Sequence, residues 1–476
     1  MDTQIIFSFL AYFSIIAAIC CYSYKQNDTV SDFALGNRSA NYWVTAISAH
    51  ASDMSSWLFM GLPAAILVGG GYKCWAAFGL AFFMFLNWHF VAPRIRVLSE
   101  STNSLTLPSL FESHLDDKSG TLRVLSALLS LFFFAFYISS GMVGMGFLFE
   151  SVFHVNYHLG ISVAILMIMI YTFMGGYTTI VITDFFQGLF LLFAIILVPS
   201  VAFTRIDGIG SIIEAAKVQG IVLSPLPEMT WEGILQVLLI SVGWGLGYFG
   251  QPHILNKFMG IENPDEIHKS KYVGMVWHIL SLSAATIIGY IGIAYFQNGL
   301  ENNELIFVEM VQDIFPPLLA GFILCAILAA TISTIDSQIL VLSSVIEEDI
   351  YKKSLRKNAS EKELLIVSRI SVVLICVLSF CIAYNKSQTV FELVQYAWSG
   401  LGSSFGPIVL LTLYYPKLSK EGAIFGLVLG GFTSAFWHTL PTFTHMEILP
   451  IIPGFFIGTL AAVLGSKIFP RTSKIV

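Results

Sequence analysis

One short stretch of the sequence combines residue types that rarely lie inside an apolar segment. The stretch from Ser48 to Ser56 (SAHASDMSS) places the carboxylate of Asp53 among hydroxyls and a histidine, and Gly61-Leu62-Pro63 follows it. At the centre of a membrane span a carboxylate costs roughly 2.5–3.5 kcal/mol on insertion scales. Acidic residues at this depth mark ion or substrate pathways, so we expect Asp53 to have a functional role.

A second stretch, SVGWGLGYFGQPHIL from Ser241 to Leu255, also interrupts an apolar segment. It holds four glycines and a proline, and a helix with this composition cannot satisfy all of its own backbone groups. Irregular backbone at membrane depth is tolerated only where protein or a water-filled cavity surrounds it. Glycines can also serve tight helix packing, which is our interpretation of Gly141, Gly144, Gly426 and Gly430. Pro252, between Gln251 and His253, is not explained by packing.

The third stretch, LAATISTIDSQ from Leu328 to Gln338, places Ala330, Ser333 and Thr334 on one helical face at i, i+3 and i+4. Hydroxyls on a membrane helix often bond only to their own backbone carbonyls. A small hard cation, however, prefers oxygen ligands. The carbonyls of a broken helix together with two hydroxyls from a neighbouring helix would supply such ligands. The sequence therefore predicts a cation site shared by this stretch and the one around Asp53.

Composition places these stretches in a membrane protein. Of the 476 residues, 56% are hydrophobic and 11% are charged, against about 25% charged in an ordinary soluble domain. The net charge of −6 comes with no basic stripe, so no nucleic-acid partner is expected. The first apolar segment, Ile5 to Tyr24, lacks a basic start and a cleavage pattern, and we expect it to be retained. The six cysteines show no metal-binding spacing and are interpreted as small buried hydrophobes.

Thirteen segments are long enough to cross a bilayer. They cover 4–24, 41–69, 74–97, 122–153, 157–179, 183–205, 231–256, 272–297, 312–349, 366–384, 389–415, 421–439 and 448–468. With the N-terminus outside, only four of the 24 Lys and Arg residues fall on the outer side, namely Lys73, Arg205, Lys217 and Lys386. The positive-inside rule therefore predicts an outside N-terminus and an inside C-terminus.

The two interrupted segments occupy matching places five helices apart. This arrangement predicts two inverted five-helix repeats, at 41–205 and 231–415, within one transmembrane transporter domain over residues 1–476. One extra helix at 4–24 precedes the repeats, and two helices at 421–468 follow them. An all-α polytopic membrane protein with 13 transmembrane helices and a midplane binding site is expected.

The three stretches resemble those of the solute:sodium symporter family, and most closely its sodium/proline symporters. The resemblance also covers FALGNRS, LTLPSLFE, DDKS and YTFMGGY, so it extends over most of the chain. It implies a LeuT-like 5+5 inverted-repeat fold, in agreement with the span count. It further implies a multi-pass protein of the bacterial cytoplasmic membrane that takes up L-proline with sodium as co-substrate. No other cofactor and no obligate protein partner are expected.

The resemblance also implies roles for individual residues. The sodium ligands would be the main-chain oxygens of Ala51, Met54 and Ala330 and the hydroxyls of Ser333 and Thr334, and Asp53 would be needed for sodium coupling. The substrate-binding residues would be Ser55, Trp57, Tyr137, Trp244, Tyr248 and Pro252. Aromatic faces suit a pyrrolidine ring, and the N-termini of half-helices suit a carboxylate.

The chain departs from its relatives at two positions near this site. Proline symporters of this type commonly carry glycine where this chain has His50 and Ser56. His50 could pair with Asp53 or could face another helix, and Ser56 could reshape the substrate pocket. A symporter for another small amino or carboxylic acid is therefore an alternative.

Two other classes fit less well. A membrane-embedded enzyme would need clustered catalytic groups or metal ligands, whereas the ten histidines are scattered. His154 and His158 have helical spacing, but they lie at a loop. A passive channel does not require alternating access, so it would leave the interrupted helices without a function.

Overall fold

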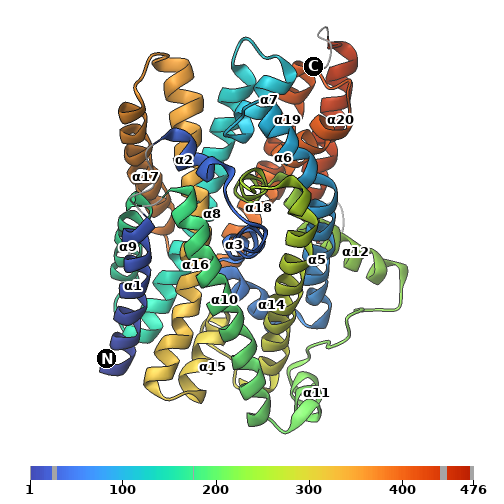
Figure 1. Cartoon of the computed structure of the whole chain (residues 1–476). Coiled ribbons are helices and arrows are strands. Elements are labelled where there is room, and N and C mark those ends of the chain that lie inside the picture. The colour runs from blue at the N-terminus through green and yellow to red at the C-terminus, as the bar shows by residue number, and fades with distance from the viewer. Residues whose placement is uncertain (1, 24–28, 175, 440–446, 472–476) are drawn as a thin grey trace.

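The computed structural model describes residues 2–23, 29–174, 176–439 and 447–471, and these residues form helices (Figure 1). The first half contains α1 (Thr3–Ser23), α2 (Val30–Leu35), α3 (Tyr42–Met54), α4 (Gly61–Gly69), α5 (Trp75–Leu86), α6 (Ala92–Ser101), α7 (Leu107–Leu115), α8 (Thr121–Phe153), α9 (Tyr157–Met174), α10 (Tyr177–Ala202) and α11 (Gly208–Gln219). The second half contains α12 (Trp231–Gly245), α13 (Pro252–Met259), α14 (Ile267–Tyr295), α15 (Ile306–Ile314), α16 (Pro317–Ser344), α17 (Glu361–Ala383), α18 (Val390–Tyr414), α19 (Lys420–Phe436) and α20 (Ile451–Ile468). The all-α prediction is confirmed for the described residues.

Each of the thirteen predicted segments coincides with one helix or with helices in series, but some boundaries were wrong. The range 312–349 is divided, because Pro316 adopts an extended conformation between α15 and α16. The boundary between 157–179 and 183–205 lies earlier than predicted, since α9 ends at Met174 and α10 begins at Tyr177. The short helices α7, α11 and α15 were not predicted as separate elements.

Nine of the described helices are long and apolar enough to cross a membrane, or up to ten if a bent pair counts as one span. The bent pair consists of α3 and the helical residues from Ser56 to Gly69, at an angle of 70°. The described start of α1 and the described end of α20 lie at opposite ends of the bundle (Figure 1). Lys25 and Lys474, which were counted on the inner side, lie outside the described residues.

The first predicted break, expected near Ala51–Ser56, lies within that range. Asp53 still belongs to the last turn of α3, and the helix ends at Ser55, whose φ of 45° and ψ of −168° are not helical. Positive φ is strained for a residue with a Cβ atom, and such strain collects at functional sites. Pro63 lies in the first turn of α4, where a missing N–H breaks no helical hydrogen bond.

The second predicted break separates α12 from α13. A 3-10 turn at Leu246–Gly250 follows α12, and Gln251 is extended before Pro252 begins α13. Pro252 has no N–H to donate to the Tyr248 carbonyl, and the Asn87 side-chain amide donates to this carbonyl instead at 3.1 Å. The Gln251 side chain donates to the carbonyls of Gly247 and Trp398. Side chains therefore satisfy backbone groups that the helix cannot.

A buried ion pair connects the second broken helix to the first half of the chain. Lys257 of α13 lies 2.8 Å from Asp184 of α10, and both side chains are 1% exposed. Asp184 also accepts hydrogen bonds from Ser48 of α3 and Ser337 of α16. Four helices thus contact one carboxylate. Two of its partners, Ser48 and Lys257, lie close in sequence to the two breaks.

We expect Lys257→Met to destabilise the protein by about 3–5 kcal/mol, because it leaves a buried carboxylate without its cation. Adding Asp184→Asn should recover most of this loss. Denaturant unfolding of the detergent-solubilised protein measures both effects. The control is Lys269→Met, which removes an exposed ion pair with Glu266 and should change the stability little. Equal losses for Lys257→Met and Lys269→Met would contradict a structural role for the buried pair.

Candidate functional site

The break after α3 leaves one backbone hydrogen bond unmade. Side chains of α16 bond to both its donor and its acceptor. In a continued helix the Ser55 N–H would donate to the Ala51 carbonyl. Instead the Ser55 N–H donates to the Thr334 hydroxyl at 3.0 Å, and the Ser333 hydroxyl donates to the Ala51 carbonyl at 2.9 Å. Both hydroxyls also donate to the Ala330 carbonyl within α16, at 3.0 and 2.9 Å. Several oxygens from two helices therefore face each other at one place.

Asp53 lies beside these oxygens and is held by two tyrosines. The Tyr248 hydroxyl donates to its carboxylate at 2.5 Å, and the Tyr137 hydroxyl donates to its main-chain carbonyl at 3.3 Å. Tyr248 comes from the turn after α12, and Tyr137 comes from α8. Asp53 is 5% exposed, so the acid is buried within protein contacts. The two broken helices thus meet at this carboxylate.

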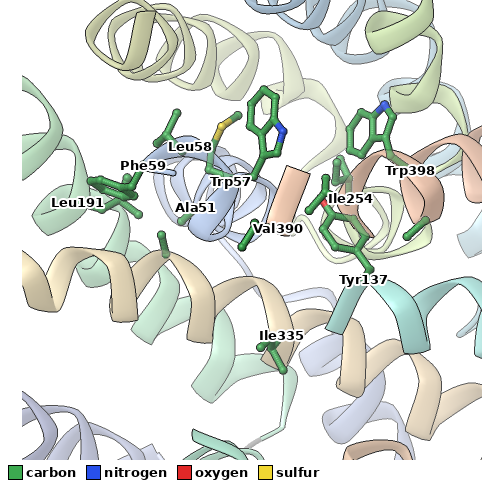
Figure 2. Packing of buried hydrophobic residues seen from close by; sticks show 14 of the residues in the cluster. Ala51, Trp57, Leu58, Phe59, Tyr137, Leu191, Ile254, Ile335, Val390 and Trp398 are labelled. Carbon is green, nitrogen blue, oxygen red and sulfur yellow. The ribbon is translucent and has the colours of Figure 1, made fainter. Parts of the chain in front are cut away.

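A small cavity lies next to Asp53 between the two broken helices. It is lined by Asp53, Met54, Trp57, Leu80, Tyr137, Trp244, Tyr248, Val394 and Trp398. The rings of Trp57 and Trp244 are 4.9 Å apart, and Tyr248 meets Trp398 edge-on at 5.0 Å. Figure 2 shows Trp57, Tyr137 and Trp398 reaching this region from three different elements. The cavity volume of about 10 Å³ holds about one water, so a larger solute requires movement of these rings.

The sequence matches the sodium:solute symporter family over residues 33–430. This chain belongs to that family. It is 37% identical to the osmoregulated proline transporter OpuE of Bacillus subtilis, over 100% of this chain and 96% of the relative. It is 39% identical to the sodium/proline symporter of Escherichia coli, over 98% and 93%. It is 40% identical to the high-affinity proline transporter PutP of Bacillus subtilis, over 96% of each.

Solved structures show the same fold at lower identity. A Na⁺-coupled sialic acid symporter, in a substrate-bound outward-open state, matches with a TM-score of 0.84, 17% identity and 99% coverage of both chains. MhsT in complex with L-phenylalanine matches with a TM-score of 0.58 and 13% identity, over 90% of this chain and 98% of that one. Together with the apolar helices, the family and the bacterial relatives support a multi-pass protein of the bacterial cytoplasmic membrane.

The structure of this family member brings most of the predicted residues together. Ala51, Ala330, Ser333 and Thr334 share the hydrogen bonds between α3 and α16. Met54, Trp57, Tyr137, Trp244 and Tyr248 line the cavity. Two predicted substrate residues do not line it. The Ser55 hydroxyl accepts from the Trp57 N–H at 3.2 Å, and Pro252 starts α13.

Trp398 of α18 is a cavity residue that sequence reasoning missed. Its indole N–H donates to the Trp244 carbonyl at 2.8 Å, another backbone group at the second break. The ring lies against Gly247, where an added Cβ would come within 1.9 Å of the indole nitrogen. A tryptophan followed by Ser399-Gly400, inside a helix rich in small residues, was the available signal.

The two departures from the family pattern both point away from the cavity. His50 faces α14, since its Nδ1 lies 3.1 Å from Nδ1 of His278, and it receives the Trp88 indole N–H at 3.1 Å. The described contacts of His50 include no bond to Asp53. Ser56 is fully buried against Gly144 of α8. Asp336 of α16, a further buried acid, accepts a hydrogen bond from Thr172 at 2.5 Å.

Gly247→Ala should weaken binding of the transported solute about 10- to 100-fold, because the new methyl group forces Trp398 out of place and overpacking costs about 1–3 kcal/mol. Binding to the purified protein measures this effect. The matched control on the same broken helix is Gly243→Ala, whose Cβ would have the Leu449 side chain as its nearest neighbour, at 3.1 Å. An unchanged affinity in Gly247→Ala would show that the position of Trp398 does not shape the site.

Proposed function

We propose that this chain is a secondary active transporter that couples inward sodium movement to uptake of L-proline across the cytoplasmic membrane by alternating access. The observation that carries the proposal is the missing backbone hydrogen bond between Ala51 and Ser55. Its carbonyl and its N–H bond instead to Ser333 and Thr334, beside an aromatic cavity. Full-length relatives named as sodium/proline symporters support the same substrate pair. The role is that of a transporter and not of an enzyme.

In this proposal sodium binds where the two helices exchange hydrogen bonds. Its ligands are the main-chain oxygens of Ala51, Met54 and Ala330 and the hydroxyls of Ser333 and Thr334. A hydroxyl can turn its proton away and offer its lone pairs, so the cation replaces hydrogen bonds without a large backbone movement. Asp53 supplies the negative charge that a monovalent cation needs close by, and Tyr137 and Tyr248 hold it in place.

L-Proline binds in the aromatic cavity once the cavity opens. The rings of Trp57, Tyr137, Trp244 and Tyr248 present flat apolar faces to the pyrrolidine ring. The residues that line the cavity in the described part of the chain include no Lys or Arg, which disfavours a second carboxylate on the solute. His50 and Ser56 lie outside this lining, so the departures from the family pattern leave the residues that line the cavity unchanged.

The membrane arrangement completes the proposal. Thirteen spans, with the N-terminus outside and the C-terminus inside, contain two inverted repeats at 41–205 and 231–415. One sodium that moves with a zwitterion carries a net positive charge. An inside-negative potential then contributes about 2.3 kcal/mol per 100 mV to uptake.

Uptake of labelled L-proline into proteoliposomes should require sodium, and potassium or choline should not replace it. Ser333→Ala and Thr334→Ala should each raise the sodium concentration for half-maximal uptake about 10- to 100-fold, since each removes one oxygen that contacts the cation. Ser343→Ala is the control on the same helix, because among the described residues its hydroxyl bonds only to the Leu340 carbonyl. Wild-type sodium activation in both test variants would place the sodium site elsewhere.

Unlabelled L-proline should displace labelled L-proline completely, whereas D-proline and glucose should displace hardly any. The cavity is chiral, close-fitting and poor in polar groups, so it offers few partners to a sugar. The competition is measured at saturating sodium in the same proteoliposomes. If a sodium gradient drives uptake of another small solute and L-proline does not compete, symport stands and the choice of substrate is wrong.

A further inference from the structure

A chain of four side-chain contacts leads away from Asp53 and passes through residues that the proposed function has not used. The Tyr248 hydroxyl donates to Asp53 at 2.5 Å, and Nε2 of His278 lies 3.4 Å from the same hydroxyl. Nδ1 of His278 lies 3.1 Å from Nδ1 of His50, and the Trp88 indole N–H donates to Nε2 of His50 at 3.1 Å. The chain thus connects Trp88, in the π-helical segment Asn87–Val91 after α5, with α3 and α14 and with the acid beside the proposed cation ligands.

The Trp88 end of the chain determines which atom donates in every hydrogen bond. An indole nitrogen only donates, so Nε2 of His50 must accept. A neutral His50 then carries its proton on Nδ1 and donates it to Nδ1 of His278. His278 in turn carries its proton on Nε2, next to the Tyr248 hydroxyl.

The end at Asp53 gives the same assignment independently. An ionised carboxylate only accepts, so the Tyr248 hydroxyl gives its single proton to Asp53. Its oxygen is then an acceptor, and Nε2 of His278 must be the donor. All links therefore donate toward Asp53.

The surrounding residues leave the chain little freedom. His50, His278 and Tyr248 are fully buried, and Trp88 is 1% exposed. Gly274 of α14 makes room for His50, since a Cβ there would come within 2.5 Å of its Nε2. Trp277 stacks on the His50 ring at 5.9 Å. Donors and acceptors in such a buried chain strengthen one another, and a missing link leaves polar groups unpaired.

We propose that His50 and His278 are positioning residues for sodium coupling. Because His278 donates to the Tyr248 oxygen, the Tyr248 hydroxyl cannot donate to His278 and donates to the Asp53 carboxylate instead. His50 and Trp88 hold His278 in the tautomer that does this. The chain thereby keeps the end of α3 in the form that receives the cation, and the role rests on the proposed sodium-coupled function.

The protonation pattern can be read without any transport. In full-length protein labelled with ¹⁵N-histidine, NMR should show one ring protonated on Nδ1 and one on Nε2 that belong to this pair. The signals are assigned by their loss in His50→Leu and in His278→Leu, among the ten histidines of the chain. The same tautomer in both rings, or a doubly protonated ring, would overturn the proposal.

Transport variants test the consequence. His278→Leu should raise the sodium concentration for half-maximal uptake about three- to tenfold, the size of one lost hydrogen bond. Uptake at saturating sodium should stay close to wild type. His278→Gln should recover most of the loss, because its amide can accept from His50 and donate to Tyr248. Gly274→Ala should resemble His278→Leu, since it displaces His50 and changes no member of the chain.

His268→Gln is the control, an exposed histidine at the start of the same helix, and it should leave sodium activation unchanged. A lower maximal rate with wild-type sodium activation in His278→Leu would mean that the pair is only structural. If wild-type uptake needs no sodium, the proposed function fails, and the NMR result still decides the direction of the chain.

Discussion

The structure depends on one backbone hydrogen bond that is not made, the one from the Ser55 N–H to the Ala51 carbonyl. A membrane interior supplies no water for the two separated groups, so protein must satisfy both. Ser333 and Thr334 do so from α16, one on each group. This requirement fixes α3 and α16 side by side in one register. It also explains why the hydroxyls of Ser333 and Thr334 form hydrogen bonds with the end of α3 as well as within their own helix.

The second break follows the same rule with different donors. Asn87 and Trp398 donate to the carbonyls of Tyr248 and Trp244, and both donors are side chains of neighbouring helices. The two breaks then meet where the Tyr248 hydroxyl reaches Asp53. A movement of either broken helix must strain or release that contact. The site therefore lies between two broken helices, and side chains of neighbouring helices hold each of them. This arrangement suits a protein that alternates between conformations.

Sequence reasoning located the two breaks, the hydroxyl pair and most of the aromatic cavity, because glycine, proline and buried polar residues are local signals. It could not find Asn87, His278 or Trp398. Each of these acts on a backbone or side-chain group far away in sequence, and no local pattern marks the donor that an orphaned carbonyl will recruit. Pro252 was assigned to the cavity for its place in a motif. In the structure it starts α13, where its missing N–H and fixed φ fit the first turn of a helix.

In the proposed function, sodium and substrate share the last turn of α3, and this makes their coupling a local property. Met54 lines the aromatic cavity, whereas the next peptide N–H bonds to Thr334 among the proposed cation ligands. A cation that orders this turn removes part of the ordering cost that the substrate would otherwise meet. By thermodynamic linkage the substrate must favour the cation to the same extent. Ser55, whose backbone is strained, lies between the two proposed sites, so a change of its conformation would affect both.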